Sequence, residues 1–214
     1  MARWSDTADR QAPPRRFAGG APLTFAWLGV LLATTLIQHA LTGHRLREVL
    51  LGGSTNLHHL AVDPIQVLVA SLLWIDGYYW WPWAILFAVF LAPAERWLGQ
   101  WRWLVVGLAA HVIATYVSEG VLYLQIREAV ASPRLTDARD IGVSYFVAGI
   151  AGVLTYRIVV PWRWVYLAVM VLAVGIPLAL HPNFTALGHA CALAVGLACY
   201  PLVRRLTPRG PQRP

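Results

Sequence analysis

The chain of 214 residues is 58% hydrophobic and only 13% charged, whereas a soluble domain carries about 25% charged residues. This composition excludes an ordinary soluble domain and predicts several membrane spans, because apolar runs of about 18 residues with few charges are typical of transmembrane helices. The net charge of +7 would also suit a nucleic-acid-binding protein. The arginines, however, stand at the ends of the apolar runs and not in one patch, so no nucleic-acid partner is expected.

Six uncharged stretches predict an all-α, polytopic bundle of six transmembrane helices within a membrane domain of residues 21–206. They cover residues 17–44, 77–94, 103–118, 141–156, 164–180 and 183–203. The third and fourth stretches are 16 residues long, so they must tilt or extend into flanking polar residues to cross the bilayer. The flanking segments 1–20 and 207–214 are rich in Arg and Pro, which predicts disordered tails.

The arginines predict the orientation of these spans. Six crossings place twelve arginines on the side of the two termini and five on the other side, while the acids divide three to seven in the opposite sense. The positive-inside rule then predicts that both termini lie in the cytoplasm. Arg15-Arg16 ahead of the first run could also belong to a secretory signal, but no small-x-small cleavage site follows, which favours an uncleaved span.

The first external loop, residues 44–79, contains a second apolar segment at 64–75. Twelve residues make about 18 Å of helix, which is too short to span and predicts an interfacial helix. The aromatic residues that follow are typical of a membrane-interface belt: Tyr78, Tyr79, Trp80, Trp81 and Trp83. A seventh crossing here would invert everything downstream and remove the arginine asymmetry. The second external loop, residues 119–140, mixes both charges and is expected to be a solvated connection.

Polar residues inside membrane spans are costly, and they are therefore functional candidates. Those of interest here are His39, His111, Ser144 and His189. Ser144 follows Asp140 by four residues, which places it about 6 Å into its span, and His189 follows Asn183 by six residues, about 9 Å into its own. Both enter from the outer side, so they share a depth at which a histidine can activate a serine as a nucleophile.

Small residues on both spans predict close packing between them. Ser144, Ala148 and Gly152 form one stripe, and His189, Ala192 and Gly196 form another. If these stripes face each other, close backbone approach brings Ser144 to His189. The alternative for Ser144 is a packing serine bonded to its own helix. For His111, a structural hydrogen bond to a neighbouring helix is favoured. No acidic or thiol cluster accompanies His58 and His59, so neither a metal nor a cofactor is expected.

Three segments resemble motifs of the rhomboid intramembrane serine proteases. Residues 188–198 are similar to the last catalytic helix of that family, Gly142-Val143-Ser144-Tyr145 resembles the G-x-S-G nucleophile motif, and residues 94–99, which contain Glu95, resemble the segment that closes the second helix. The resemblance implies Ser144 as nucleophile and His189 as base, with Gly142, Ala192 and Gly196 as motif support. More narrowly, the chain resembles divergent rhomboid-like proteins of actinobacteria, which implies a multi-pass protein of a bacterial plasma membrane.

Two departures from the family pattern bear on activity. Tyr145 replaces the glycine after the nucleophile, and Tyr79 and Trp83 stand where the family has an H-x-x-x-N motif whose side chains hold the oxyanion. Loss of one oxyanion donor costs about two to three orders of magnitude in rate. Candidate replacements are the backbone N–H groups around Ser144, or a side chain of the first loop: Asn56, His58 or His59.

The sequence thus favours two functions. One is an intramembrane serine protease that cuts a transmembrane substrate near the outer face. The other is a rhomboid pseudoprotease that binds or chaperones transmembrane clients within the lipid bilayer. A transporter is a weaker third, because no inverted repeat or paired interrupted helix is visible.

Overall fold

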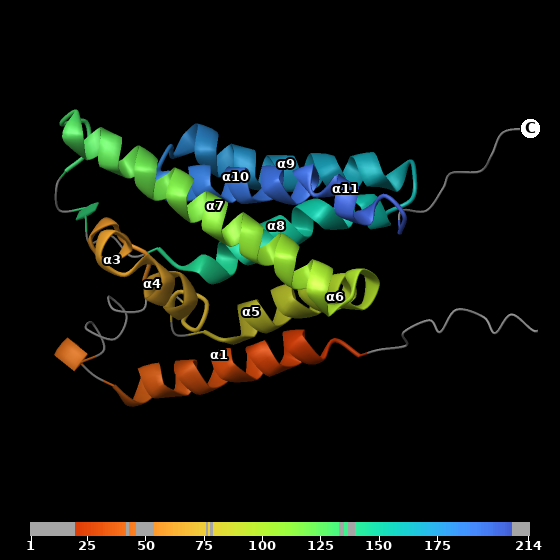
Figure 1. The fold of residues 1–214 in the computed structure, drawn as a ribbon, viewed down its shortest axis with the longest axis horizontal. Helices are drawn as coiled ribbons and strands as arrows, with labels where there is room; N and C mark the ends of the chain where they lie inside the picture. The colour runs from red at the N-terminus through yellow and green to blue at the C-terminus, as the bar shows by residue number, and fades with distance from the viewer. Residues whose placement is uncertain are drawn as a thin grey trace, which may run out of the picture.

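The computed structural model describes residues 20–41, 43–45, 54–75, 77, 79–132, 135–136 and 140–206, and every regular element in that part of the chain is a helix. The helices form one bundle in which most of the long axes run roughly side by side (Figure 1). Apart from Gly20, the tails predicted to be disordered, 1–20 and 207–214, lie outside the described residues.

Helix α1, Pro22–Ala40, lies at the edge of the bundle (Figure 1). Its first residue is a proline, which suits the first turn because the missing N–H would have no helical partner there. Only four residues of α1 are buried: Thr24, Leu31, Thr35 and Gln38. The intervals between them are seven, four and three residues, so they lie on one face of the helix. The opposite face of α1 is apolar and exposed, as expected of a surface that contacts lipid.

The first loop contains two short helices, α3 (Leu57–Val62) and α4 (Pro64–Ala70). Asn56 caps α3 by accepting the His59 N–H, and Asp63 caps α4 by accepting the Gln66 N–H. The apolar segment expected to form an interfacial helix over 64–75 is thus helical only to Ala70, with Ser71 as its C-cap.

Residues 81–98 form one continuous helical segment, made of α5 (Trp81–Leu86), the π-helical turn η1 (Phe87–Leu91) and α6 (Ala92–Leu98). Pro93 has no N–H and its ring crowds the carbonyl four residues earlier, so a wider turn ahead of it relieves the helix. Gly99 then ends the segment with φ of 77°, a backbone conformation that favours glycine.

Helix α7, Gln100–Arg127, has 28 residues and extends well beyond the predicted third span. The expectation that a solvated loop begins at residue 119 is wrong, because the helix continues for two and a half more turns. The boundary at residue 119 was predicted from charge alone. Glu, Leu, Gln and Arg, which recur in the segment that follows, are all good helix formers, so the helix does not end there. Glu119 is therefore a helical residue, and it is buried.

Helices α8 (Gly142–Leu154) and α10 (Phe184–Ala198) pack most extensively against each other and against α7. Nearly every residue of α8 is buried, so this helix occupies the centre of the bundle. A short 3-10 turn, η3 (Thr155–Arg157), follows α8, and α11 (Tyr200–Val203) follows α10.

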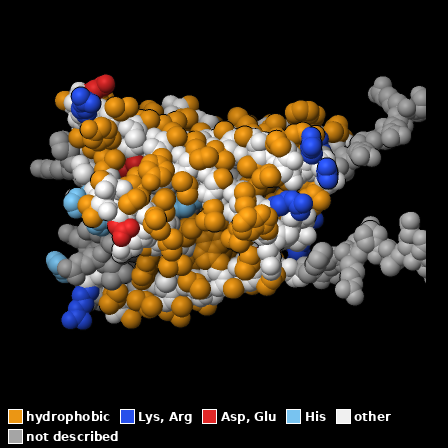
Figure 2. Space-filling view, viewed as in Figure 1, with side chains coloured by type: hydrophobic (Ala, Val, Ile, Leu, Met, Phe, Trp, Pro, Cys, Tyr) orange, Lys and Arg blue, Asp and Glu red, His pale blue; other side chains and the backbone are white. Residues whose placement is uncertain are grey.

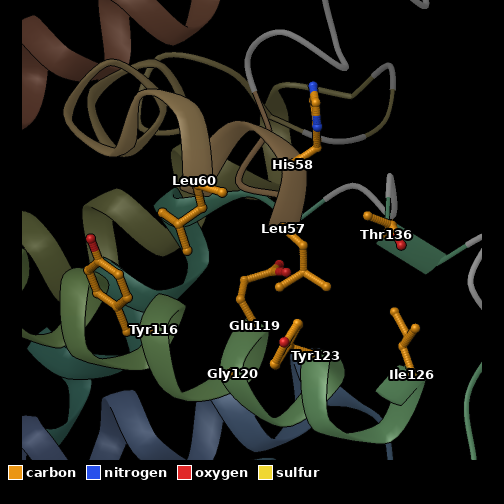
Figure 3. A pocket seen from close by; sticks show the side chains of 10 residues that line it. Leu57, His58, Leu60, Tyr116, Glu119, Gly120, Tyr123, Ile126 and Thr136 are labelled. Atoms are coloured by element: carbon orange, nitrogen blue, oxygen red, sulfur yellow. The ribbon is translucent and has the colours of Figure 1, made fainter. Parts of the chain in front are cut away.

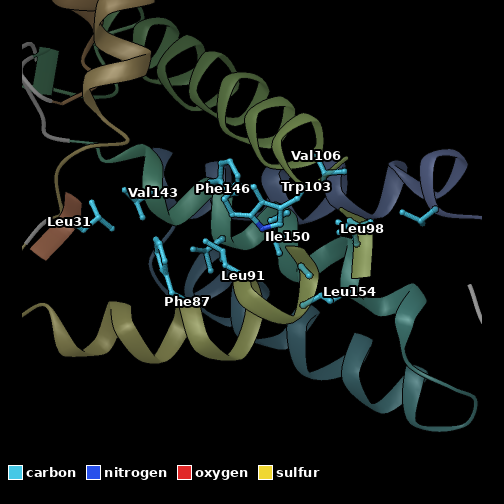
Figure 4. Close-up of a cluster of buried hydrophobic side chains, with 14 of the residues drawn as sticks. Leu31, Phe87, Leu91, Leu98, Trp103, Val106, Val143, Phe146, Ile150 and Leu154 are labelled. Carbon is cyan, nitrogen blue, oxygen red and sulfur yellow. The ribbon is translucent and has the colours of Figure 1, made fainter. Parts of the chain in front are cut away.

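The main buried cluster surrounds α8 on the side of η1 and α7 (Figure 4). Phe146 is its hub: the centroid of its ring lies 4.8 Å from those of both Trp27 and Trp103. Trp27 also contacts Phe87 of η1 at 5.0 Å. This aromatic cluster joins α1, η1, α7 and α8 into one body, each ring pair contributing about 0.5–1.5 kcal/mol beyond its buried area.

Helix α9, Trp162–Leu180, carries the clearest evidence for a membrane environment. It has 19 residues and a mean hydropathy of 2.0, yet none of its residues is buried. An apolar surface of this size is not stable in water. By length and composition, α1, α7 and α9 can each cross a bilayer, and α10 is a shorter apolar helix.

Charged side chains collect at the two ends of the bundle, and apolar side chains cover the middle of the visible face (Figure 2). Described arginines lie in α6, η3 and the first turns of α7 and α9, and directly after α11: Arg96, Arg102, Arg157, Arg163, Arg204 and Arg205. Arg127 is the last residue of α7, whose C-terminal end lies at the opposite end of the bundle (Figure 1). Helices lie in all six stretches predicted to span. The number of crossings and the orientation stay predictions.

Candidate functional site

The interface between α8 and α10 depends on glycines at the points where the two backbones meet. A Cβ on Gly196 would overlap the Gly149 backbone, and one on Gly152 would meet the Leu193 carbonyl and the Gly196 backbone. Small residues permit this approach of two membrane helices. The faces in contact therefore include Gly149 and Gly152 of α8 and Gly196 of α10.

Tyr145 occupies this interface near the N-terminal ends of α8 and α10. The side chain is fully buried, its hydroxyl donates to Asp140 Oδ2 at 2.6 Å, and its ring meets the His189 ring edge-on at 5.0 Å. A Cβ on Gly188 would overlap the Tyr145 ring and hydroxyl. The glycine before His189 thus provides the space into which the tyrosine packs.

Ser144 and His189 are each hydrogen-bonded within their own segment. Ser144 Oγ donates to the Ile141 carbonyl at 3.0 Å, and His189 Nδ1 lies 2.9 Å from the Thr185 carbonyl. Because a carbonyl only accepts, Nδ1 carries the proton and Nε2 is left as the acceptor. No hydrogen bond joins Ser144 to His189 in the part of the chain that the structure describes, so their catalytic pairing stays a prediction.

The three oxyanion candidates lie together on α3. The Asn56 amide is buried and caps this helix, with Oδ1 accepting the His59 N–H at 2.9 Å and Nδ2 lying 3.2 Å from His59 Nδ1. His58 is exposed. The neighbouring Thr55 ties the loop to the start of α8, because its N–H and Oγ1 donate to the Asp140 carbonyl at 2.9 and 3.1 Å.

The expected structural hydrogen bond of His111 is confirmed. His111 Nε2 lies 3.1 Å from the Leu68 carbonyl and 3.4 Å from Ser71 Oγ, which links α7 to the end of α4. A Cβ on Gly142 would overlap the His111 ring. Gly142 of the nucleophile-like motif therefore makes room for a histidine of another helix.

Glu95 is buried and binds the first turn of α1. Its carboxylate accepts the Leu23 N–H at 3.0 Å, the Thr24 N–H at 2.8 Å and the Thr24 hydroxyl at 2.7 Å. A carboxylate at a helix N-terminus satisfies unpaired N–H groups and complements the helix dipole. Glu95 thus joins the end of α6 to the start of α1, which gives this motif-support residue a structural contact.

Two buried carboxyls, Asp140 and Glu119, were not predicted as site residues. Asp140 is 2% exposed, and burial raises its pKa to about 6 even though the Tyr145 hydroxyl, the Ile141 backbone and the Ser118 hydroxyl stabilise the charged form. Glu119 is 1% exposed and close enough to Asp140 to interact with it electrostatically.

The sequence assigned both carboxyls to a solvated loop, and that expectation is wrong. The signal that could have identified Glu119 is its position in a continuous run of helix formers next to an apolar span, where a lone acid is a functional candidate. Within the described residues, no group of three or more His, Cys, Asp or Glu side chains lies close enough together to hold a metal ion.

A helical bundle in which the long apolar helix α9 has no buried residue, and in which α8 and α10 pack closely at glycines, defines a multi-pass α-helical membrane protein. The family model described as rhomboid-like protein matches residues 16–209. This match covers almost the whole chain, and the chain belongs to the rhomboid-like protein family. No match was found among curated proteins or among solved structures.

Proposed function

We propose that this protein is a rhomboid pseudoprotease, a membrane scaffold that binds transmembrane segments of client proteins without cleaving them. The observation that carries the proposal is the position of Tyr145. Its ring is buried against His189 and Gly188 and anchored to Asp140, in the interface where a protease brings its base to its serine.

The hydrogen bonds of Ser144 agree with this proposal. A general base must lie about 2.6–3.2 Å from the group whose proton it removes, and the Ser144 proton is directed to the Ile141 carbonyl instead. The residues at the family's oxyanion positions, Tyr79 and Trp83, are not the His and Asn of the family motif, and Tyr79 is 70% exposed. Asn56 caps α3 through Oδ1, and Nδ2, the donor that an oxyanion would need, lies 3.2 Å from His59 Nδ1.

One observation favours the alternative, an intramembrane serine protease. The Thr185 carbonyl holds the proton of His189 on Nδ1, which is the tautomer that a general base needs when Nε2 accepts the serine proton. In that case Ser144 would rotate away from Ile141 on substrate binding, as loosely aligned apo sites permit.

Labelling with a fluorophosphonate probe distinguishes the two functions. We expect no labelling of the full chain in detergent, under conditions that label an active rhomboid protease. The matched variants are Ser144→Ala, His189→Ala and, as a control at an exposed serine, Ser132→Ala. Labelling that the first two abolish and the third retains would establish the protease.

The scaffold also requires binding of a client helix. We expect a dye-labelled Leu/Ala transmembrane peptide to show energy transfer to the protein in lipid vesicles, with equal efficiency for wild type and Ser144→Ala. Absence of both labelling and energy transfer would refute the scaffold as well as the protease.

We further propose that the protein lies in the plasma membrane of a bacterium with both termini in the cytoplasm. The proposal rests on the division of arginines between the two ends of the bundle. Fusions of green fluorescent protein to either terminus should fluoresce in a bacterial host, because this protein does not fluoresce after export through the general secretory route. A dark C-terminal fusion with a fluorescent N-terminal one would mean an odd number of crossings.

A further inference from the structure

A pocket of about 520 Å³ lies between α3 and the C-terminal half of α7 (Figure 3). This volume falls within the range of about 300–1,000 Å³ that is usual for small-molecule sites. The lining is almost entirely apolar or aromatic and includes Leu57, Leu60, Ala61, Tyr116, Tyr123 and Ile126. The pocket therefore suits a ligand with an apolar body.

Glu119 is the acidic residue of this lining. Its side chain is 1% exposed, and neither carboxyl oxygen has a hydrogen-bond partner among the described residues. Figure 3 shows the carboxyl directed from α7 toward Leu57 of α3. A buried carboxyl that lacks a donor is costly, so a ligand that supplies one would relieve that cost.

The charges around Glu119 favour a cation as that donor. The carboxyl of Asp140 adds a second acidic group nearby, and no arginine is among the described residues that line the pocket. His58 also lines it, but its ring points away from Glu119 in Figure 3. The site thus places two carboxyl groups near each other, and no arginine among the described lining residues neutralises them.

Two tyrosines add a preference for organic cations. Tyr116 and Tyr123 lie three residues before and four residues after Glu119 on α7, so the three side chains share one helix face. Both rings are in the pocket wall. Aromatic faces attract ammonium and guanidinium groups through the ring quadrupole.

We propose that this pocket binds an organic cation, an ammonium or guanidinium group on an aliphatic stem, with the head on Glu119 and the stem against Leu57 and Leu60. Two sources share this chemistry: the Lys or Arg side chain of a client's juxtamembrane segment, and a free amphiphilic amine. The site does not involve Ser144 or His189 and does not depend on whether they are catalytic.

The test measures binding of n-hexylguanidinium and of the neutral n-hexanol to the full chain in lipid nanodiscs by isothermal titration calorimetry. The isosteric variant Glu119→Gln removes the charge, and Glu128→Gln removes the same charge from an exposed position at the end of the same helix. We expect the cation to bind wild type and Glu128→Gln equally, and Glu119→Gln about 10- to 100-fold more weakly.

A second variant guards against a folding defect in Glu119→Gln. Gly120 lines the pocket, and a Cβ there meets nothing within 4 Å, so Gly120→Leu should fill the pocket, keep the carboxyl and also weaken binding. Binding of hexylguanidinium that is no tighter than that of hexanol, or that survives Glu119→Gln, would overturn the proposal.

A competition arm distinguishes the two sources. A Leu/Ala transmembrane peptide with one Arg at its outer end is compared with the same peptide carrying Gln. Displacement of hexylguanidinium by the Arg peptide alone identifies a client side chain as the source. Binding of hexylguanidinium that neither peptide displaces identifies a free amine. The fluorophosphonate result is independent of both outcomes, so this proposal and the pseudoprotease proposal can fail separately.

Discussion

Replacement of Tyr145 by phenylalanine removes one hydroxyl from the centre of the bundle and leaves the ring in place. The buried Asp140 carboxyl then loses the hydrogen bond that it accepts at 2.6 Å. Hydrogen bonds to charged groups contribute about 1.5–3 kcal/mol. For a chain of this size, that loss corresponds to a decrease in melting temperature of roughly 3–12 °C.

The effect should depend on pH in a defined direction. The pKa of Asp140 is raised from its ordinary value of 3.8 to about 6 in the folded protein, so the folded state disfavours the charged carboxylate. Its contribution to stability is therefore greatest below pH 4 and declines as the pH rises to 6, by about 3 kcal/mol in total. Because the Tyr145 bond stabilises the charged form, Tyr145→Phe should raise the pKa further and destabilise the protein more at pH 8 than at pH 5.

Tyr166→Phe is the matched control. The Tyr166 hydroxyl donates at 2.8 Å to the Ala151 carbonyl, a neutral acceptor, so its loss should cost about 1 kcal/mol at every pH. Melting temperatures of the two variants in detergent, followed by intrinsic tryptophan fluorescence between pH 5 and pH 8, provide the comparison. Glu119 also lies near Asp140 and is present in both variants. An equal loss for Tyr145→Phe at both pH values would refute the reasoning.

Three other changes test the packing and the capping contacts. Gly196→Ala should destabilise the fold by about 1–3 kcal/mol, because the added methyl overlaps the Gly149 backbone. A Cβ at Gly120 meets nothing within 4 Å, so Gly120→Ala should instead stabilise α7 by about 0.5–1 kcal/mol. If both changes had a similar effect on the melting temperature, the close approach of α8 and α10 would be contradicted. Glu95→Ala should cost about 2–4 kcal/mol and expose the start of α1 to hydrogen exchange, because three donors lose their acceptor. The control is Glu128→Ala, which removes an exposed acid. Equal hydrogen exchange at the start of α1 in both variants would argue against the cap.

The buried histidine contact was predictable from sequence, and so was the membrane class. His111 stands alone in an apolar helix, where a polar group must find a partner on a neighbour. The apolar stretches could only be helices, because a bilayer leaves unpaired backbone groups no water to bind. Residue type and local spacing are sufficient for both conclusions.

Rotation about the helix axis was not predictable. The contact face of α8 includes Tyr145, Gly149 and Gly152, whereas spacing alone suggested a stripe that begins at Ser144. Adjacent residues differ by about 100° around a helix, so one residue decides whether serine or tyrosine meets His189. Ala148 and Gly149 are both small, and Gly152 belongs to both faces, so the small residues of α8 could not distinguish them.

The environment of the acids likewise required the tertiary structure. Glu119 and Asp140 are buried because α3 and Thr55 of the first loop, more than fifty residues earlier in the chain, return to cover the ends of α7 and α8. Composition, apolar length and arginine distribution determine that this chain is a helical membrane protein. Each is a property of a local segment, and each affects the free energy of transferring that segment from water to lipid. Which side chains meet at the α8–α10 interface, and which carboxyl is left without a partner, depends on contacts between distant segments.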